Sequence, residues 1–191
     1  MNTLEAIAAR RSIRKFKADP IPADVLQTVL RAALQAPSGK NKQPWRWVVV
    51  SGERRDEMMR YMRTGIAAAK ARGLNPGSAE WTAKIMERAP VTIFVFNPHG
   101  LPPWQPHSME QMIDSVVDVQ SVGAAIQNVL LAAQDQGLGS LWICDVFYAY
   151  EEVCTWLGEA GQLVAAVALG YADESPAPRP RKPASEVVRM L

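Results

Sequence analysis

Two short segments near the start of the chain hold most of the residue types that could do chemistry. The first, residues 10–16, reads Arg-Arg-Ser-Ile-Arg-Lys-Phe and offers three arginines and a hydroxyl. Guanidinium groups form forked, charge-assisted hydrogen bonds with phosphate, and a serine adds a short donor. We therefore predict that Arg10, Arg11, Ser12 and Arg14 form an anion site. The alternative is a solvated helix end, because cations are favourable near a helix C-terminus.

The second segment, residues 36–45, reads Ala-Pro-Ser-Gly-Lys-Asn-Lys-Gln-Pro-Trp. Its two prolines and its glycine disfavour regular structure, so its hydroxyl and amide side chains keep free donors and acceptors. Such groups suit the edge of a flat heterocycle, although a simple turn before a strand explains the same residues. The predicted ring-binding residues are Pro37, Ser38, Gly39, Asn41 and Gln43.

Helical and strand-like patterns surround these segments. Apolar spacing predicts helices over residues 4–11, 22–35, 53–72, 78–88, 109–136 and 150–157, and strands over 45–51, 91–96, 141–144 and 162–169. This order lacks a regular βαβ alternation, so a doubly wound nucleotide fold is a poor match. No dinucleotide fingerprint or phosphate loop is present either. The pattern predicts an α+β fold, and the length suits a single domain over residues 1–191.

Three segments have special compositions. Residues 97–108 contain four prolines, both histidines and Trp104, which is typical of a lid, so residues 97–113 are the candidate substrate loop. An aromatic ring there could stack on a flat acceptor, although a loop histidine is most often a surface residue. The helix over residues 109–136 is apolar on nearly every face from Ser121 onward, which predicts burial and a subunit interface. The tail, residues 175–191, is predicted to be an extended arm. The candidate substrate-binding residues are Trp104, His107, Met109 and Met112.

Composition excludes several classes of function. A net charge of +2 is too small for a nucleic-acid partner. Cys144 and Cys154 cannot form a disulfide framework, and their apolar neighbours predict buried thiols in a reducing, cytoplasmic setting. We expect no signal peptide and no membrane span, because the most apolar stretch, residues 122–133, is too short to cross a bilayer. No Cys and His cluster has metal-ligand spacing, so no metal is expected.

The two opening segments, taken in order with residues 133–142 and 169–183, resemble the signature of the nitroreductase family of flavin enzymes. The resemblance runs nearly end to end. It implies a nitroreductase-like fold with a mostly antiparallel central sheet flanked by helices, and a homodimer with FMN sites at the interface. NADH or NADPH would be the electron donor.

The resemblance also implies roles for individual residues. The arginine segment would hold the flavin's phosphate and ribityl chain, with Arg14 near the pyrimidine edge, where a fixed cation favours the reduced, anionic flavin. Residues 37–43 would reach the flavin of the partner subunit. The strand residues Trp142, Ile143, Cys144 and Asp145 would bring backbone amides to flavin N5, while a simple buried strand is the alternative. Further candidates are Arg179 and Arg181 at the phosphate, unless they only solubilise the tail, and Lys84 at the pyrimidine edge.

The activity that this resemblance implies is hydride transfer from NAD(P)H, through the flavin, to a nitroaromatic, quinone or similar flat acceptor by a ping-pong mechanism. No acid or base side chain is required. Two alternatives stay open. The fold could serve a dedicated flavin reaction, such as that of a dehydrogenase, a dehalogenase or a flavin-fragmenting enzyme, or the protein could bind flavin without turnover.

Overall fold

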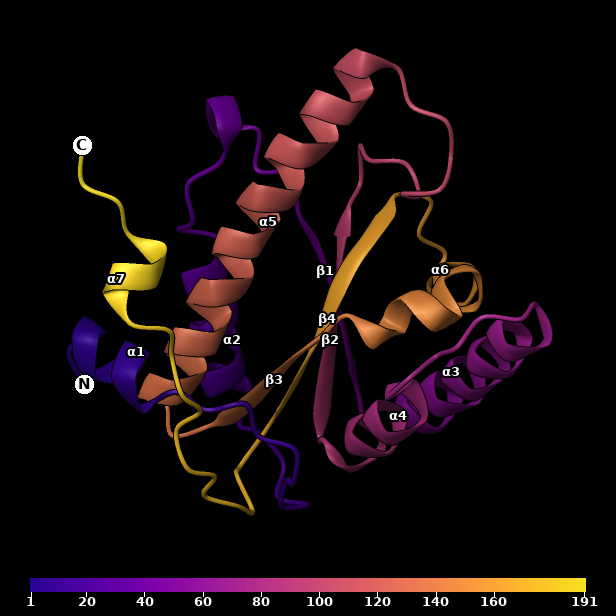
Figure 1. Cartoon of the computed structure of the whole chain (residues 1–191). Coiled ribbons are helices and arrows are strands. Elements are labelled where there is room, and N and C mark those ends of the chain that lie inside the picture. The colour runs from indigo at the N-terminus through magenta and orange to yellow at the C-terminus, as the bar shows by residue number, and fades with distance from the viewer.

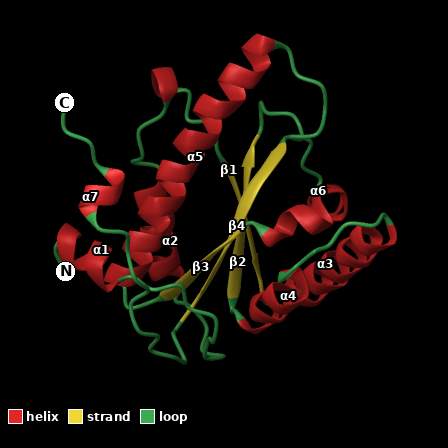
Figure 2. Cartoon of the chain, in the orientation of Figure 1, coloured by secondary structure: helices red, strands yellow, loops and turns green.

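The computed structural model describes residues 1–191 and has a four-stranded sheet with helices on both faces (Figures 1 and 2). The strands are β1 (Arg46–Ser51), β2 (Val91–Asn97), β3 (Gly139–Ile143) and β4 (Gln162–Gly170), in the spatial order β1-β2-β4-β3. Every neighbouring pair is antiparallel. The predicted α+β class and antiparallel sheet are confirmed.

The two central strands are buried along their whole length. Each residue of β2 and β4 is shielded from solvent, so both strands read as continuous apolar runs rather than as alternating ones. A register shift between Val95 and Phe96 breaks the β2–β4 ladder near one end. The sheet therefore divides the core into two layers.

One layer lies between the sheet and the helices α3 (Arg54–Ala71), α4 (Ala79–Arg88) and α6 (Tyr150–Leu157), on the right of Figure 1. The short 3-10 helix η2 (Asp145–Ala149) belongs to the same layer. Phe94 and Phe96 of β2 point into it and meet a group of methionines from α3 and α4. Methionine side chains bend readily, which lets them fill the irregular space against the aromatic rings.

The other layer is built by α1 (Thr3–Ala9), α2 (Ala23–Ala33) and α5 (Met109–Asp135). α5 is long and apolar enough to span a membrane by length and composition alone. However, Val122, Ile126 and Val129 of its C-terminal half are fully buried against α2 and the sheet. This packing identifies α5 as a core helix of the fold.

Three local expectations were wrong. The first helix ends at Ala9 instead of continuing to Arg11, because Arg10 turns to an extended backbone with ψ of 134°. Cys144 is exposed rather than buried, since it follows Ile143 on the outward side of β3, and Cys154 is only half-buried. The arm contains a one-turn helix, α7 (Ala184–Val187), that no periodicity indicated.

Candidate functional site

The arginine segment is held between two parts of the sheet that are distant in sequence. Ser12 bridges Ser140 of β3, and the backbone N–H of Ile13 donates to the Ser140 carbonyl over 2.9 Å. On its other side, Phe16 bridges Ala172 just beyond β4. The carboxylate of Glu174 accepts from the backbone N–H groups of both Arg14 and Lys15. Leaving the helix at Ala9 is therefore what lets residues 10–16 run as an extended strip between β3 and the arm.

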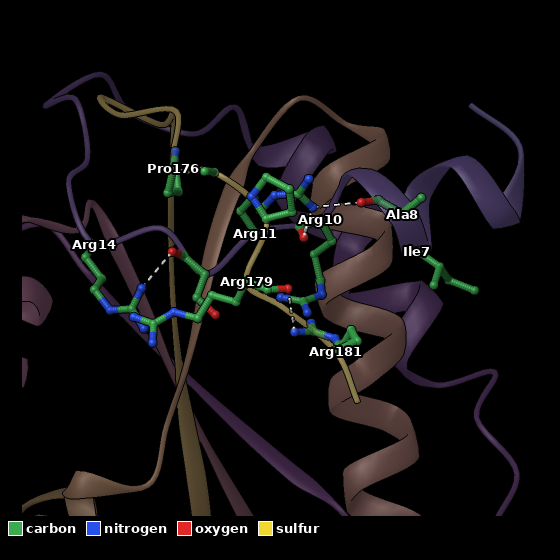
Figure 3. Close-up of a pocket in the computed structure, with 11 residues that line it drawn as sticks. Ile7, Ala8, Arg10, Arg11, Arg14, Pro176, Arg179 and Arg181 are labelled. Carbon is green, nitrogen blue, oxygen red and sulfur yellow. Dashed lines mark hydrogen bonds between the residues drawn. The ribbon is translucent and has the colours of Figure 1, made fainter. Parts of the chain in front are cut away.

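This pairing brings the arm over the arginine segment and creates a cavity of about 370 Å³, here called the arginine pocket. Figure 3 shows five arginines gathered around it from two stretches of backbone. Their side chains donate only to main-chain carbonyls, as Arg11 does to Ala8 over 2.7 Å and Arg14 to Ser12 over 3.0 Å. None of the five guanidinium groups lies within 4 Å of a carboxylate. The five are Arg10, Arg11, Arg14, Arg179 and Arg181.

Five cations around one hollow without a counter-ion repel one another, and an anion with several oxygens would relieve that repulsion. The arrangement is thus suited to a phosphate or a similar anion. The predicted grouping of Arg10, Arg11, Ser12 and Arg14 with Arg179 and Arg181 is present in the structure.

Arg14 also lines two neighbouring cavities, so it joins the arginine pocket to the rest of the site. Its guanidinium lies 5.8 Å from the ring centre of Trp81 on α4, a cation–π contact that fixes its direction. Lys84, one turn further along α4, lines one of these cavities with Arg14 and Trp81. Trp81 thus forms a wall of the site.

The second neighbouring cavity, here called the ring-side cavity, is lined by the end of β3. Trp142, Ile143, Cys144 and Asp145 all border it, together with Arg14 and Trp81. Its volume is about 180 Å³. The end of β3, which was predicted to contact a flavin ring, thus lies next to the arginine pocket, which was predicted to bind a phosphate.

Two hydroxyls from the start of α4 fix the acid at this strand end. Ser78 and Thr82 donate to the same carboxylate oxygen of Asp145, over 2.9 Å and 2.5 Å. Beside it, partial burial and then the negative charge of Asp145 raise the pKa of the Cys144 thiol. A thiol with a raised pKa is a poor nucleophile at neutral pH, which argues against covalent catalysis by Cys144.

The loop over residues 37–43 lies elsewhere in the same chain. It packs on α5, where the backbone N–H of Gly39 donates to Ser121 Oγ over 3.2 Å. It contains the 3-10 turn η1 (Gly39–Asn41) and three non-glycine residues with positive φ: Lys40 at 52°, Asn41 at 54° and Gln43 at 51°. Such strain clusters at functional sites. None of Pro37, Ser38, Gly39, Asn41 and Gln43 lines the arginine pocket or the two cavities beside it.

The candidate substrate residues do not form one cluster. Trp104 packs edge-on against Tyr150 of the α6 layer, with ring centres 4.6 Å apart. His107 contacts the carbonyl of Gln105 over 2.5 Å and lines a different, polar cavity. Met109 and Met112 lie exposed on the first turns of α5. Their substrate role stays a prediction.

Sequence reasoning missed several residues of the site. The hydroxyls of Ser78 and Thr82, the ring of Trp81 against Arg14, and the Glu174 carboxylate all depend on contacts between segments far apart in sequence. Trp81 carried the only signal in the sequence, because a large aromatic residue stands there three positions before Lys84. Single hydroxyls and acids carry no local pattern that could have found the others.

Comparison with known proteins identifies the family of this chain. A family model described as "Nitroreductase family" matches residues 7–171. The chain belongs to the nitroreductase family. The match includes the arginine segment and the ring-side cavity but ends before the arm, so Arg179 and Arg181 lie outside the shared region.

Two curated relatives and one solved structure place the chain within this nitroreductase family. An NADPH-flavin oxidoreductase from Vibrio harveyi is 32% identical, over 98% of this chain and 72% of that protein. An iodotyrosine deiodinase from Thermotoga neapolitana is 28% identical, over 94% of this chain and 91% of that protein. A nitroreductase-type protein from Desulfovibrio desulfuricans, solved in complex with FMN, has a TM-score of 0.77 and 27% identity, over 100% of this chain and 97% of that one.

Proposed function

We propose that this nitroreductase-family protein is an FMN-dependent oxidoreductase that takes hydride from NADH or NADPH and passes electrons to a flat small-molecule acceptor. The observation that carries the proposal is the arginine pocket: five arginines without a carboxylate partner, connected through Arg14 to the end of β3. FMN has a phosphate at one end and a flat ring at the other. The relatives named for flavin chemistry support the same cofactor.

Bound FMN would supply the redox chemistry by accepting and donating hydride at its ring. The chain's own residues bind and orient it. The arginine pocket holds the phosphate, and Ser12 adds a hydroxyl donor beside it. Arg14, held by Trp81, places a fixed positive charge next to the ring-side cavity, which favours a ring that carries negative charge after reduction.

The end of β3 provides the contact to the reacting edge of the ring. Backbone amides at Cys144 and Asp145 are the proposed donors, and the hydroxyls of Ser78 and Thr82 hold Asp145 so that this turn is rigid. Lys84 stands at the pyrimidine side with Arg14 and Trp81. A rigid set of donors needs no reorganisation during the reaction, which is how such sites stabilise developing charge.

A homodimer follows from the division of the proposed site. The strained loop over residues 37–43 carries Ser38 and Asn41 but lies apart from the arginine pocket of its own chain, so it would serve the pocket of a partner. α5 also exposes one apolar stripe that a partner would cover. Met109, Met112, Ile113 and Val116 form this stripe and are 52% to 75% exposed.

The acceptor is proposed to be a nitroaromatic, a quinone or a similar flat molecule, with alternating use of one face in a ping-pong mechanism. Trp104, His107, Met109 and Met112 are the proposed acceptor contacts. A cytoplasmic location fits the supply of NAD(P)H. The deiodinase among the relatives supports one other candidate, a dedicated flavin reaction such as reductive dehalogenation.

The deciding experiment is an anaerobic visible spectrum of FMN-reconstituted protein, recorded before and after NADH or NADPH and again after a quinone or nitroaromatic. We expect the flavin absorbance to bleach with a donor and to recover with an acceptor. A bound flavin whose absorbance does not change with either donor would instead support the dedicated flavin reaction. Failure to bind FMN would contradict the proposal.

A further inference from the structure

The polar cavity that His107 lines, of about 300 Å³, lies beside the N-terminal half of α5, where the loop over residues 97–108 connects β2 to α5. We call it the acid pocket, because Asp114 and Asp118 face it and Lys42 is its one permanent cation. Both histidines of the protein, His99 and His107, also line it. The proposed flavin chemistry uses neither carboxylate.

Asp118 is a buried carboxylate whose negative charge is only partly balanced by nearby groups. The residue is 4% exposed, and its Oδ1 atom has no hydrogen-bond partner. Lys42 Nζ lies 3.9 Å from that oxygen but 3.2 Å from Asp114 Oδ1, so the lysine pairs mainly with the outer acid. A buried carboxylate without a donor is costly, and a cationic donor placed in the pocket would remove that cost.

Asn97 provides an unpaired donor in the same pocket. It is fully buried at the end of β2, and its Oδ1 accepts from the backbone N–H of His99 over 3.0 Å. Because a backbone N–H can only donate, this contact fixes the amide so that Nδ2 is the other atom, and Nδ2 has no partner. An oxygen on a ligand would satisfy it.

The absence of a side chain at Gly100 leaves space beside this donor. A Cβ at this position would lie 2.6 Å from Asn97 Nδ2 and 2.5 Å from Gln162 Oε1, so it would fill the floor of the pocket. Two buried, unpaired polar atoms of opposite kind therefore share one polar hollow with a glycine at its floor. With two carboxylates against one lysine, the hollow carries a net charge of −1 with neutral histidines, which disfavours anions.

We propose that the acid pocket binds the ammonium end of a small organic cation that also carries an oxygen acceptor, with Asp118 receiving the ammonium and Asn97 donating to the oxygen. No set of three His, Cys, Asp or Glu side chains in the protein is arranged to hold a metal ion, so an organic cation fits better. The acid pocket shares no lining residue with the arginine pocket or the ring-side cavity, although His107 is also a proposed acceptor contact and Lys42 belongs to the loop over residues 37–43, and its binding requires no redox step.

The geometry of α5 leaves the pocket free even if the apolar stripe is covered. Asp114, Ser115 and Asp118 repeat at helical spacing along one row, and the stripe from Met109 to Val116 runs along another. The two rows are offset by two residues, which places them on opposite faces of the helix. A partner seated on the stripe would not fill the acid pocket.

The test uses the two histidines as reporters. Since both line the pocket and the chain has no others, their imidazole NMR signals serve as reporters of this pocket. Ethanolamine would be titrated at constant pH and ionic strength into FMN-loaded and FMN-free protein. The matched probes are ethylene glycol, in which a hydroxyl replaces the ammonium, and glycolate, in which a carboxylate replaces the aminomethyl group. We expect saturable shifts with ethanolamine, and shifts at least about tenfold weaker in affinity with the other two.

Two variants with different mechanisms and one control complete the design. Asp118→Asn removes the receiving charge, and Gly100→Ala fills the floor, so each should weaken ethanolamine binding by about tenfold or more. Glu110→Gln removes one negative charge from the exposed first turn of α5 without touching the pocket, and should bind as wild type does. Far-UV circular dichroism checks folding of each variant.

Several outcomes would overturn the proposal. Unmoved histidine signals in wild-type protein would mean that water or a partner occupies the pocket. Equal affinity for ethylene glycol, or an equal loss in Glu110→Gln, would mean that no specific ammonium site exists. Because the titration is run with and without FMN, it succeeds or fails independently of the proposed oxidoreductase activity.

Discussion

The arginine pocket and the acid pocket are similar in size, about 370 Å³ and 300 Å³, but opposite in construction. The first gathers five cations with no carboxylate within 4 Å, from two loop segments near opposite ends of the chain. The second holds its charges nearly balanced, with two carboxylates on α5 and one lysine on the loop over residues 37–43. Uncompensated charge of one sign predicts the ligand class strongly, whereas a nearly balanced pocket reveals its ligand only through atoms that have no partner.

The largest expected effect tests the uncompensated charge. Removing two guanidiniums in the double variant Arg10→Ala/Arg11→Ala should weaken FMN binding by about a hundredfold or more, because each charge-assisted hydrogen bond to phosphate is strong. Fluorescence titration with FMN measures this. Arg189→Ala, an exposed arginine of the same arm outside the pocket, is the control. Unchanged FMN affinity in the double variant would remove the arginine pocket from the flavin site.

The second prediction is that a substitution near the acid pocket lowers the stability of the fold and leaves the arginine pocket unaffected. Tyr150 Oη accepts from the Leu163 N–H over 3.0 Å and donates to the Gly161 carbonyl over 3.4 Å, next to Gln162 at the acid pocket. Tyr150→Phe should destabilise the fold by about 1–3 kcal/mol, because a buried N–H loses its partner. The ethanolamine response should weaken while FMN affinity holds. Chemical denaturation measures the stability, with Tyr148→Phe as the control.

The same tyrosine makes a pH prediction. Burial raises the pKa of Tyr150 from 10.0 to about 12. The unfolded chain therefore loses this proton first, so the contribution is complete below pH 10 and is lost as the pH rises toward 12. The difference in unfolding free energy between wild type and Tyr150→Phe should shrink across that window. A constant difference would contradict the assignment.

The next prediction concerns the strained loop over residues 37–43, which packs on α5 and contributes Lys42 to the acid pocket. A Cβ at Gly39 would lie 2.5 Å from Val117 Cγ1, so Gly39→Ala should push the loop off the helix. If the loop completes a partner's flavin site, FMN affinity should fall by about tenfold, as expected for a misplaced polar contact. Adding Val117→Ala removes the clashing atom and should restore most of the affinity. A loss without rescue would point to a cause other than this contact.

The smallest effect is on thiol reactivity. Cys144 is exposed at the ring-side cavity, but its raised pKa keeps the thiolate scarce at neutral pH. Iodoacetamide should therefore modify it slowly at pH 7 and faster above pH 9, and FMN should protect it several-fold. Cys154, half-buried with its pKa raised to about 11, should react more slowly and without FMN protection. Mass spectrometry distinguishes the two sites.

Much of the fold could be predicted because local sequence patterns indicate most of its helices and strands. β2 is a short apolar run, α2 has a clear apolar face, and Gly52 and Pro90 bound strands in the expected way. The errors arose where tertiary pairing overrode local preference. Arg10 leaves the helix because Ser12 and Ile13 pair with β3, which no sequence window around residue 10 contains.

The two pockets differ in the same way in how far the sequence predicts them. Arginines grouped near a serine predict an anion site from their chemistry, and the structure brings the arm's arginines to the same pocket. The acid pocket gave no such signal. Asn97 and Asp118 are ordinary residues at a strand end and within a helix, and only the fold reveals that both are buried without partners.

The arm's place over the arginine segment sets an order of events during synthesis. Arg10 and Arg11 come early in the chain and Arg179 and Arg181 come late, and Glu174 ties the arm to the segment at Arg14. A chain still growing on the ribosome has the first arginines long before those of the arm, so the full anion site forms only after the arm has been made. Tight cofactor loading would then distinguish chains that carry the arm from chains that stop before it.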